Sequence, residues 1–317
     1  MYGIGMMKTA EASIPVISVG NIAIGGTGKT PVVERLSTKL KESGFNPGIV
    51  TRGYKRKMGG TFHVDAECNT AEDAGDEAFM LAKRTKIPVI VGIDRAQAIE
   101  LGVKAFQIDV ALLDDGFQTL SVKKDMEILI LNGKEGKGSN GLFPLGPYRE
   151  PLSRIKDADV ILVNKGAPGN DEGLCSEVIP AYKVQYKPAY LYNVKKNLIA
   201  HYNLIKDRKI LAFSGLGDNE SFFNLLKDMG ADVVHEISYP DHYAYERDDI
   251  EKLLSYKGVA AMVTTEKDAV KIAHMDVPVH LYYLAIDVVI EREQELLEHI
   301  VHTIEAKKKG FICQKKC

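Results

Sequence analysis

The sequence predicts an α/β protein built on parallel sheets, because short apolar runs alternate with stretches of helical spacing along its 317 residues. The apolar runs are nearly continuous, which is typical of strands buried on both faces of a parallel sheet. The composition, 45% hydrophobic and 26% charged, is that of a globular protein. At about 150 residues per domain, the length allows roughly two domains.

The first half of the chain alternates predicted strands and helices. A strand over 14–19 is followed by a helix over 29–43, which we expect to end at Gly44. The spacing of its apolar residues gives this helix one buried face, made of Val32, Val33, Leu36 and Leu40. Further strands are predicted at 48–51, 88–91, 110–113, 126–131 and 160–163, and further helices at 74–84 and 95–106.

The second half begins with a change of amino-acid composition between about residues 166 and 208. Prolines, glycines and alternating tyrosines there predict a loop and then a short, solvent-facing β-ribbon. A second α/β series follows, with strands at 210–213, 233–237, 259–264 and 279–284, and helices at 219–229, 248–255 and 291–308. We therefore predict a core domain over 1–182, a β-ribbon linker over 183–208, and a smaller α/β domain over 209–317 that includes the final helix.

Charge and cysteine content exclude several classes of protein. A net charge of −2 argues against a dedicated nucleic-acid binder, which needs a large cationic surplus. Four scattered cysteines fit neither a disulfide framework nor a structural zinc site, and they suit a reducing cytoplasm. No apolar run approaches the ~18 residues of a membrane span, although a peripheral membrane contact stays open. Nothing in the sequence indicates an obligate protein partner.

A phosphate-binding loop follows the first strand. The segment Gly20-Asn-Ile-Ala-Ile-Gly-Gly-Thr-Gly-Lys-Thr30 leads directly into a predicted helix, as in P-loop nucleotide-binding domains. Glycines let backbone N–H groups surround phosphate oxygens, Lys29 supplies a charge for the β- and γ-phosphates, and the Thr30 hydroxyl can bind Mg²⁺. Ala23 stands where the usual pattern has glycine. The alternative is a glycine-rich turn with a chance lysine. The predicted nucleotide-binding residues are Ala23, Ile24, Gly25, Gly26, Thr27, Gly28, Lys29 and Thr30.

Three further polar positions follow predicted strands. Asp114 and Asp115 form an acidic pair where P-loop proteins hold Mg²⁺, although a helix cap is the alternative. Asp94 follows the strand at 88–91, and its spacing alone favours a helix N-cap. His242 lies in an exposed turn after Pro240, where a role in a site is open.

These motifs occur together, in a fixed order, in one known family. The segments that carry the resemblance are 15–21, 25–31, 51–55, 75–77, 94–95, 113–118, 145–151, 213–218, 239–243 and 264–268. Over almost the whole chain, the sequence resembles the tetraacyldisaccharide 4′-kinases of lipid A biosynthesis. The resemblance implies a P-loop kinase fold with a second, smaller α/β domain.

The resemblance also implies an activity and a set of site residues. The activity is transfer of the γ-phosphoryl group of ATP to the 4′-hydroxyl of a tetraacylated glucosamine disaccharide 1-phosphate, by a peripheral enzyme at the cytoplasmic face of the inner membrane. Asp94 would act as base with support from His242, and Lys29 would assist the transfer. Implied Mg²⁺ ligands are Thr30, Asp114, Asp115 and, more weakly, Glu150. Implied contacts to substrate phosphate or sugar are Arg52, Tyr54 and Arg149.

Two departures and one alternative accompany this interpretation. The family usually has an amphipathic N-terminal helix, but only about thirteen residues precede the first strand here, and Thr119 replaces a frequent histidine. The alternative is a nucleotide-dependent switch or metallochaperone GTPase, because Asn164-Lys165 resembles the start of a guanine-reading motif. Ala167 takes the place of the aspartate that would bind guanine, so ATP is the expected nucleotide.

Overall fold

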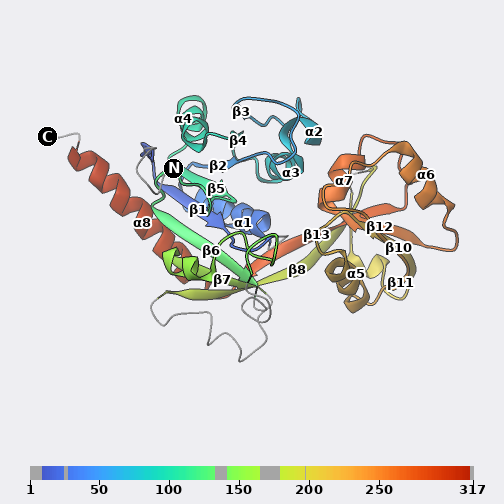
Figure 1. Cartoon of the computed structure of the whole chain (residues 1–317). Coiled ribbons are helices and arrows are strands. Elements are labelled where there is room, and N and C mark those ends of the chain that lie inside the picture. Colours follow the sequence, from blue (N-terminus) through green and yellow to red (C-terminus); the bar gives the residue numbers. More distant parts are fainter. Residues whose placement is uncertain (1–8, 25–27, 133–140, 165–178, 197, 315–317) are drawn as a thin grey trace. The chain divides into compact units, whose positions relative to one another are not determined.

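The chain divides into two compact units (Figure 1). The structure, a computed structural model, describes residues 9–24, 28–132, 141–164, 179–196 and 198–314. Unit 1 comprises Met1–Gln185 and Val288–Cys317, and unit 2 comprises Tyr186–Asp287. Two strands, β8 (Ala181–Asn193) and β13 (Leu281–Ile290), run from one unit into the other. Among the described residues, no helix is both long and apolar enough to cross a membrane.

Unit 1 is built on a mainly parallel sheet, which confirms the predicted fold class. Its strands include, in order, β8-β7-β6-β1-β5-β2-β4-β3, and along this order the neighbouring strands are parallel except β3 and β4, which are antiparallel. Their bounds are Val16–Gly20 (β1), Pro47–Thr51 (β2), Phe62–His63 (β3), Val89–Val91 (β4), Val110–Asp114 (β5), Met126–Asn132 (β6) and Val160–Asn164 (β7). Ala111 and Leu113 of β5 pack in one cluster with Ala98 of helix α4, and Leu112, which alternates with them, is equally buried. Both faces of the sheet are therefore covered.

The predicted helices of unit 1 are present, one of them with a break, whereas the 3₁₀ helix and most of α2 were not predicted. They are α1 (Lys29–Glu42), α2 (Ala71–Ala74), α3 (Asp76–Thr85), α4 (Arg95–Phe106), a 3₁₀ helix (Leu152–Asp157) and α8 (Glu293–Gln314). The four apolar residues predicted to face the core of α1 are all buried. Gly44 follows the α1 C-cap with a φ of +90°, as predicted for its stop. The helix predicted over 74–84 is divided between α2 and α3 at Gly75, whose φ of +91° no α-helix accommodates.

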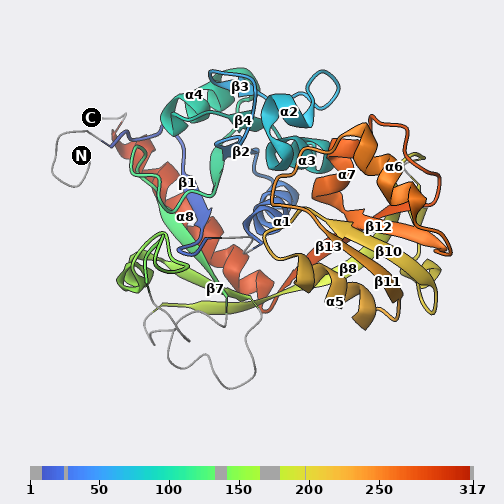
Figure 2. The same ribbon diagram turned by 45° about the vertical axis from the view of Figure 1, so that its right-hand side comes forward.

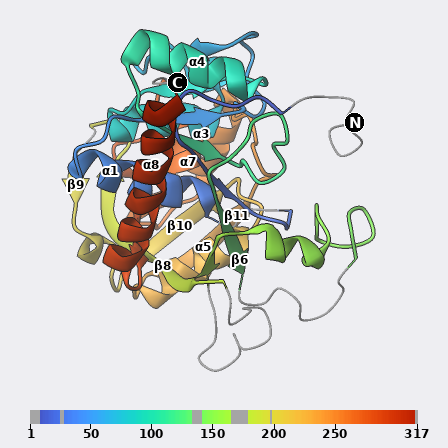
Figure 3. The same cartoon turned by 90° about the vertical axis from the view of Figure 1, so that its left-hand side faces the viewer.

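Helix α8 belongs to unit 1, whereas the domain predicted over 209–317 includes this helix. Arg35 of α1 forms two hydrogen bonds of 2.7 Å with Glu293, and Lys308 lies 2.8 Å from Asp109. The apolar side of α8 is buried by Leu296, Ile300 and Ile304. Figure 3 shows α8 beside α1. Its partners are far away in the sequence, and local spacing carries no information about them.

Unit 2 is a second α/β layer structure, as predicted. Its strands are β10 (Lys209–Ser214), β11 (Asp232–Ser238), β12 (Ala261–Thr265) and the first part of β13, with the short β9 (Ile199–Ala200) antiparallel to β8. Its helices are α5 (Asn219–Asp228), α6 (Arg247–Ser255) and α7 (Glu266–Ile272), the last of which was not predicted. Leu211 and Phe213 face α6 and α7, whereas Ile210 and Ala212 face α5. The parallel order β11-β10-β12-β13 thus has helices on both sides (Figure 2).

Candidate active site

The predicted site residues of unit 1 follow strands whose carboxyl ends lie at one edge of the sheet. Val19 of β1 is in register with Asp114 of β5, and Thr51 of β2 is in register with Val91 of β4. The loops that leave these strands therefore begin at the same edge, where open α/β sheets bind ligands. They carry the phosphate loop, the acidic pair, Arg52 and Asp94.

The Lys29 ammonium lies near two side-chain oxygens, one from the phosphate loop and one from the acidic pair. Gly28 has a φ of +81° as the N-cap of α1, and Lys29 Nζ lies 3.2 Å from Asn21 Oδ1 and 3.4 Å from Asp115 Oδ1. Asn21 is fully buried, and its amide nitrogen donates to the carbonyl of Ala23 at 2.8 Å. Asn21 thus holds both the lysine and the loop, a role that the sequence prediction missed. The predicted residues 25–27 lie outside the described part.

Asp114 is a buried carboxylate whose charge is poorly compensated. Thr30 Oγ1 donates to Asp114 Oδ2 at 3.4 Å, whereas Asp114 Oδ1 is buried without a hydrogen-bond partner. Burial, followed by the charges of Glu77 and Asp115, raises the pKa of Asp114 to about 7. A cation bound beside Asp114 would relieve this cost. Glu77, in the 75–77 motif, is a second residue near the acidic pair for which the sequence predicted no role.

Asp115 is compensated by two cations. Burial acts to raise the pKa of the Asp115 carboxyl, but the charges of Lys29 and Arg149 outweigh burial and hold it below its usual value. Arg149 Nη1 donates to Asp115 Oδ2 at 3.0 Å. Arg149, which we expected to contact the substrate, is therefore at the phosphate-loop end of the site.

The oxygen donors at this edge fit Mg²⁺. One hydroxyl and two carboxylates, each carboxylate with a buried oxygen that has no hydrogen-bond partner, are ligands of the kind that this ion takes together with water and nucleotide phosphates. The described residues contain no group of three or more His, Cys, Asp or Glu side chains that could hold a metal by themselves. Of the predicted ligands, Glu150 contacts the described part of the site through its backbone N–H, which donates to the carbonyl of Ile22 at 3.3 Å.

Asp94 is an exposed side chain at the start of α4. Its Oδ1 accepts hydrogen bonds from the backbone N–H groups of Ala96 at 3.0 Å and Gln97 at 3.1 Å. The N-cap that the spacing favoured is thus present. In the described contacts Oδ2 has no hydrogen-bond partner, so one oxygen of the carboxylate holds the helix and the other can accept a proton.

Arg95 is the buried first residue of α4. It is only 4% exposed, and its Nη1 donates to the carbonyl of Gly92 at 2.5 Å. Burial lowers the pKa of the Arg95 guanidinium to about 10, and the charges of Asp114 and Asp115 oppose that change. Arg95 therefore supplies a buried positive charge near both carboxylates. Arg52 and Tyr54, the remaining predicted substrate contacts, are exposed where the chain leaves β2.

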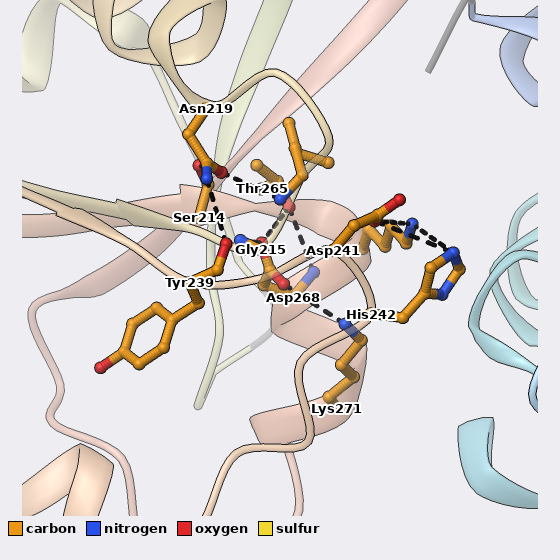
Figure 4. A network of polar contacts seen from close by, with 11 residues as sticks. Ser214, Gly215, Asn219, Tyr239, Asp241, His242, Thr265, Asp268 and Lys271 are labelled. Atoms are coloured by element: carbon orange, nitrogen blue, oxygen red, sulfur yellow. Dashed lines mark hydrogen bonds and ion pairs between the residues drawn. The ribbon is translucent and has the colours of Figure 1, made fainter. Parts of the chain in front are cut away.

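His242 lies in unit 2, within a network of polar contacts (Figure 4). Its Nε2 is 3.1 Å from Lys267 Nζ, which is also 2.9 Å from Asp241 Oδ1. The His242 backbone has a φ of +58°, a conformation that costs free energy for a residue other than glycine. His242 belongs to unit 2, whereas Asp94 belongs to unit 1.

Comparisons with known proteins agree with these motifs. A family model described as tetraacyldisaccharide-1-P 4′-kinase matches residues 1–305. The tetraacyldisaccharide 4′-kinase of Idiomarina loihiensis is 37% identical over 272 residues, covering 85% of this chain and 78% of that protein. The protein of the same name from Shewanella oneidensis is 33% identical over 312 residues, covering 98% and 88%. A crystal structure of LpxK from Aquifex aeolicus in complex with ATP matches with a TM-score of 0.79 at 33% identity, covering 96% of this chain and 92% of that one.

Proposed function

Because the chain belongs to the tetraacyldisaccharide-1-P 4′-kinase family, we propose that it transfers the γ-phosphoryl group of ATP to the 4′-hydroxyl of tetraacyldisaccharide 1-phosphate. The observation that carries the proposal is the contact of the phosphate loop with the acidic pair, through Lys29 and Thr30. This arrangement suits phosphoryl transfer, which depends on positioning and on compensation of charge.

Each site residue of unit 1 has a distinct role in the proposed reaction. Lys29 and the N-terminus of α1 bind the β- and γ-phosphates. Thr30, Asp114 and Asp115 would hold Mg²⁺, which supplies charge compensation to the phosphates when bound. Asn21 keeps Lys29 in place, and Arg95 keeps a positive charge near the acidic pair.

Asp94 is the proposed base. The 4′-hydroxyl oxygen forms a bond to the γ-phosphorus, the bond from that phosphorus to the bridging oxygen breaks, and ADP leaves. Oδ2 of Asp94 takes the hydroxyl proton, while Oδ1 stays hydrogen-bonded to the first turn of α4. His242 supports the base, and Arg52 and Tyr54 contact the phosphate or sugar of the disaccharide.

The lipid nature of the proposed substrate places the enzyme at a membrane surface. The acyl chains of a tetraacylated disaccharide stay in the bilayer, so the enzyme meets the headgroup as a peripheral protein at the cytoplasmic face of the inner membrane. Flotation with vesicles of inner-membrane lipids tests this part. Recovery of the protein only in the bottom fraction would contradict it.

The activity is tested with purified protein, ATP, Mg²⁺ and detergent-dispersed disaccharide 1-phosphate. We expect equal amounts of ADP and of disaccharide carrying a new 4′-phosphate, detected by mass spectrometry. The Lys29→Ala variant is the control and should lose both nucleotide affinity and rate. Hydrolysis of GTP without any phosphorylated disaccharide would overturn the proposal in favour of a nucleotide-dependent switch.

A further inference from the structure

We propose that Lys267 is a positioning residue that holds the imidazole of His242 neutral, with its proton on Nδ1. The inference rests on the proposed function only in giving His242 a part in the reaction. The geometry that carries it lies wholly within unit 2, in the contacts among Lys267, Asp241 and His242 (Figure 4).

The donor and acceptor chemistry of these three groups leaves one arrangement. An ammonium group has three donors and no acceptor. Lys267 Nζ lies 2.9 Å from Asp241 Oδ1 and 3.1 Å from His242 Nε2, so it donates to both atoms. A ring nitrogen that accepts a hydrogen bond carries no proton. The neutral imidazole therefore has its hydrogen on Nδ1, and Nδ1–H is the group with which His242 acts.

Asp241 holds the Lys267 side chain in place. The Lys267 side chain is 14% exposed, and the ion pair with Asp241 compensates its charge. Burial opposes ionisation of Asp241, but the hydrogen bond and charge of Lys267 outweigh it and hold the pKa of Asp241 below its usual value. Asp241 Oδ1 is also 3.8 Å from His242 Nε2, so all three groups meet at one point.

Buried hydrogen bonds fix the helix that carries Lys267. Asp268, the next residue, is fully buried and accepts from the backbone N–H of Gly215 at 2.9 Å and from Thr265 Oγ1 at 2.7 Å. Thr265 in turn caps α7 by accepting from the Asp268 N–H at 3.1 Å. The first turn of α7 is thereby tied to the loop that follows β10.

The same loop fixes the segment that carries His242. The Asn219 amide nitrogen donates to the carbonyl of Tyr239 at 3.0 Å, and its oxygen accepts from the Leu216 N–H at 2.9 Å. Three motifs that are distant in the sequence, 213–218, 239–243 and 264–268, therefore form one rigid support. A support of this kind can maintain the positive φ of His242, and strained residues held in this way are typical of functional sites.

The test compares Lys267→Met with Lys271→Met in the full-length chain. Lys271 lies one helical turn further along α7 and is similarly buried, but it contacts Asp268 at 3.4 Å instead of His242. In both variants and the wild type, the ¹⁵N shifts of the His242 ring report which nitrogen carries the proton. The His242→Gln variant assigns the signals.

We expect the wild type to have an unprotonated Nε2. Lys267→Met should move the proton toward Nε2 and lower kcat by at least about tenfold, with the KM for ATP unchanged. Lys267→Arg keeps cationic donors. Its ring proton should therefore lie closer to the wild-type position, and its kcat should be higher, than in Lys267→Met. Lys271→Met should lower the denaturation midpoint and leave the His242 signals unchanged.

Several outcomes would overturn the proposal. One is a proton on Nε2 in the wild type. A second is a Lys267→Met variant whose His242 ring ¹⁵N shifts equal those of the wild type. A third is a Lys267→Met variant whose proton has moved to Nε2 but whose kcat is that of the wild type. Should Lys267→Met not fold, the wild-type and Lys267→Arg spectra still decide the position of the proton. The spectra need no lipid substrate, so they test this proposal independently of the activity assay. If the spectra show the proton on Nδ1 but the assay yields no phosphorylated disaccharide, the proposed function is contradicted and the role of Lys267 in fixing the tautomer is not.

Discussion

Asp94 combines a role in the fold with the proposed role in the reaction, and each role uses a different oxygen of its carboxylate. Oδ1 caps α4, and Oδ2 is the proposed proton acceptor. The sequence spacing predicted the cap and the family resemblance predicted the base, and the structure makes the two compatible. Substitution can separate them, because asparagine is as good an N-cap as aspartate but cannot take a proton at neutral pH.

We expect Asp94→Asn to fold as the wild type does and to lose about 10²-fold or more in kcat. Asp94→Ala should show a similar loss in kcat and, in addition, about 1 kcal/mol in the free energy of unfolding, because the cap is removed. Steady-state kinetics and urea unfolding followed by circular dichroism measure the two effects. Turnover within twofold of wild type in Asp94→Asn would remove Asp94 from the role of base.

Asp114 gives a prediction about pH. Its pKa rises from 3.8 to about 7 in the folded protein, so between these values the folded state holds a proton that the unfolded state has released. The free energy of unfolding contributed by this group therefore falls as pH rises through that window. Without Mg²⁺ and nucleotide, the urea midpoint of the wild type should fall between about pH 5 and about pH 8 more than that of Asp114→Asn.

Addition of Mg²⁺ with ATP should reverse the loss for the wild type at the higher pH, and it should have a smaller effect on Asp114→Asn. Asp159→Asn is the control, since this carboxylate bonds the backbone N–H of Glu127 at 2.7 Å, away from the phosphate loop. If the urea midpoints of the wild type and of Asp114→Asn change equally with pH, Asp114 is not the group that causes the loss of stability.

At the scale of the elements, the sequence predicted most strands and helices because their apolar periodicity is local. The strands at 110–113 and 126–131 and the helix at 95–106 lie within a residue of their observed ends. Local periodicity cannot predict contacts between segments that are distant in the sequence. Examples are the pairing of Arg35 with Glu293 and the approach of Lys267 to His242. The site was predictable where a motif is contiguous, as in the phosphate loop, and not where supporting residues come from several loops.

Helix α8 should stabilise unit 1 through its apolar face. Ile300 is fully buried, so Ile300→Ala should cost about 2–5 kcal/mol of unfolding free energy. His302, two residues further on and exposed, is the matched control, and His302→Ala should change stability by less than about 0.5 kcal/mol. Urea unfolding by circular dichroism measures both. Equal midpoints for the two variants would contradict the packing of α8 described above.

At the scale of the whole molecule, the proposed functions are divided between the two units. The described phosphate loop, the acidic pair and Asp94 belong to unit 1, whereas His242 and its support belong to unit 2. The chain passes between the units in β8 and β13. Nucleotide binding is thus expected to depend on residues of unit 1, and a residue of unit 2 is expected to act on the transfer step.

This division predicts different kinetic signatures for two single substitutions. His242→Ala should leave the Kd for ATP unchanged and lower kcat by about 10²-fold, since it removes support for the base. Lys29→Ala should weaken ATP binding and lower kcat together, because the same ammonium is proposed to contact the phosphates in both the bound and the transition states. Calorimetric titration gives the Kd, and single-turnover kinetics give the transfer rate. A tenfold weaker Kd for ATP in His242→Ala would assign His242 to nucleotide binding, and the separation of roles between the units would then be wrong.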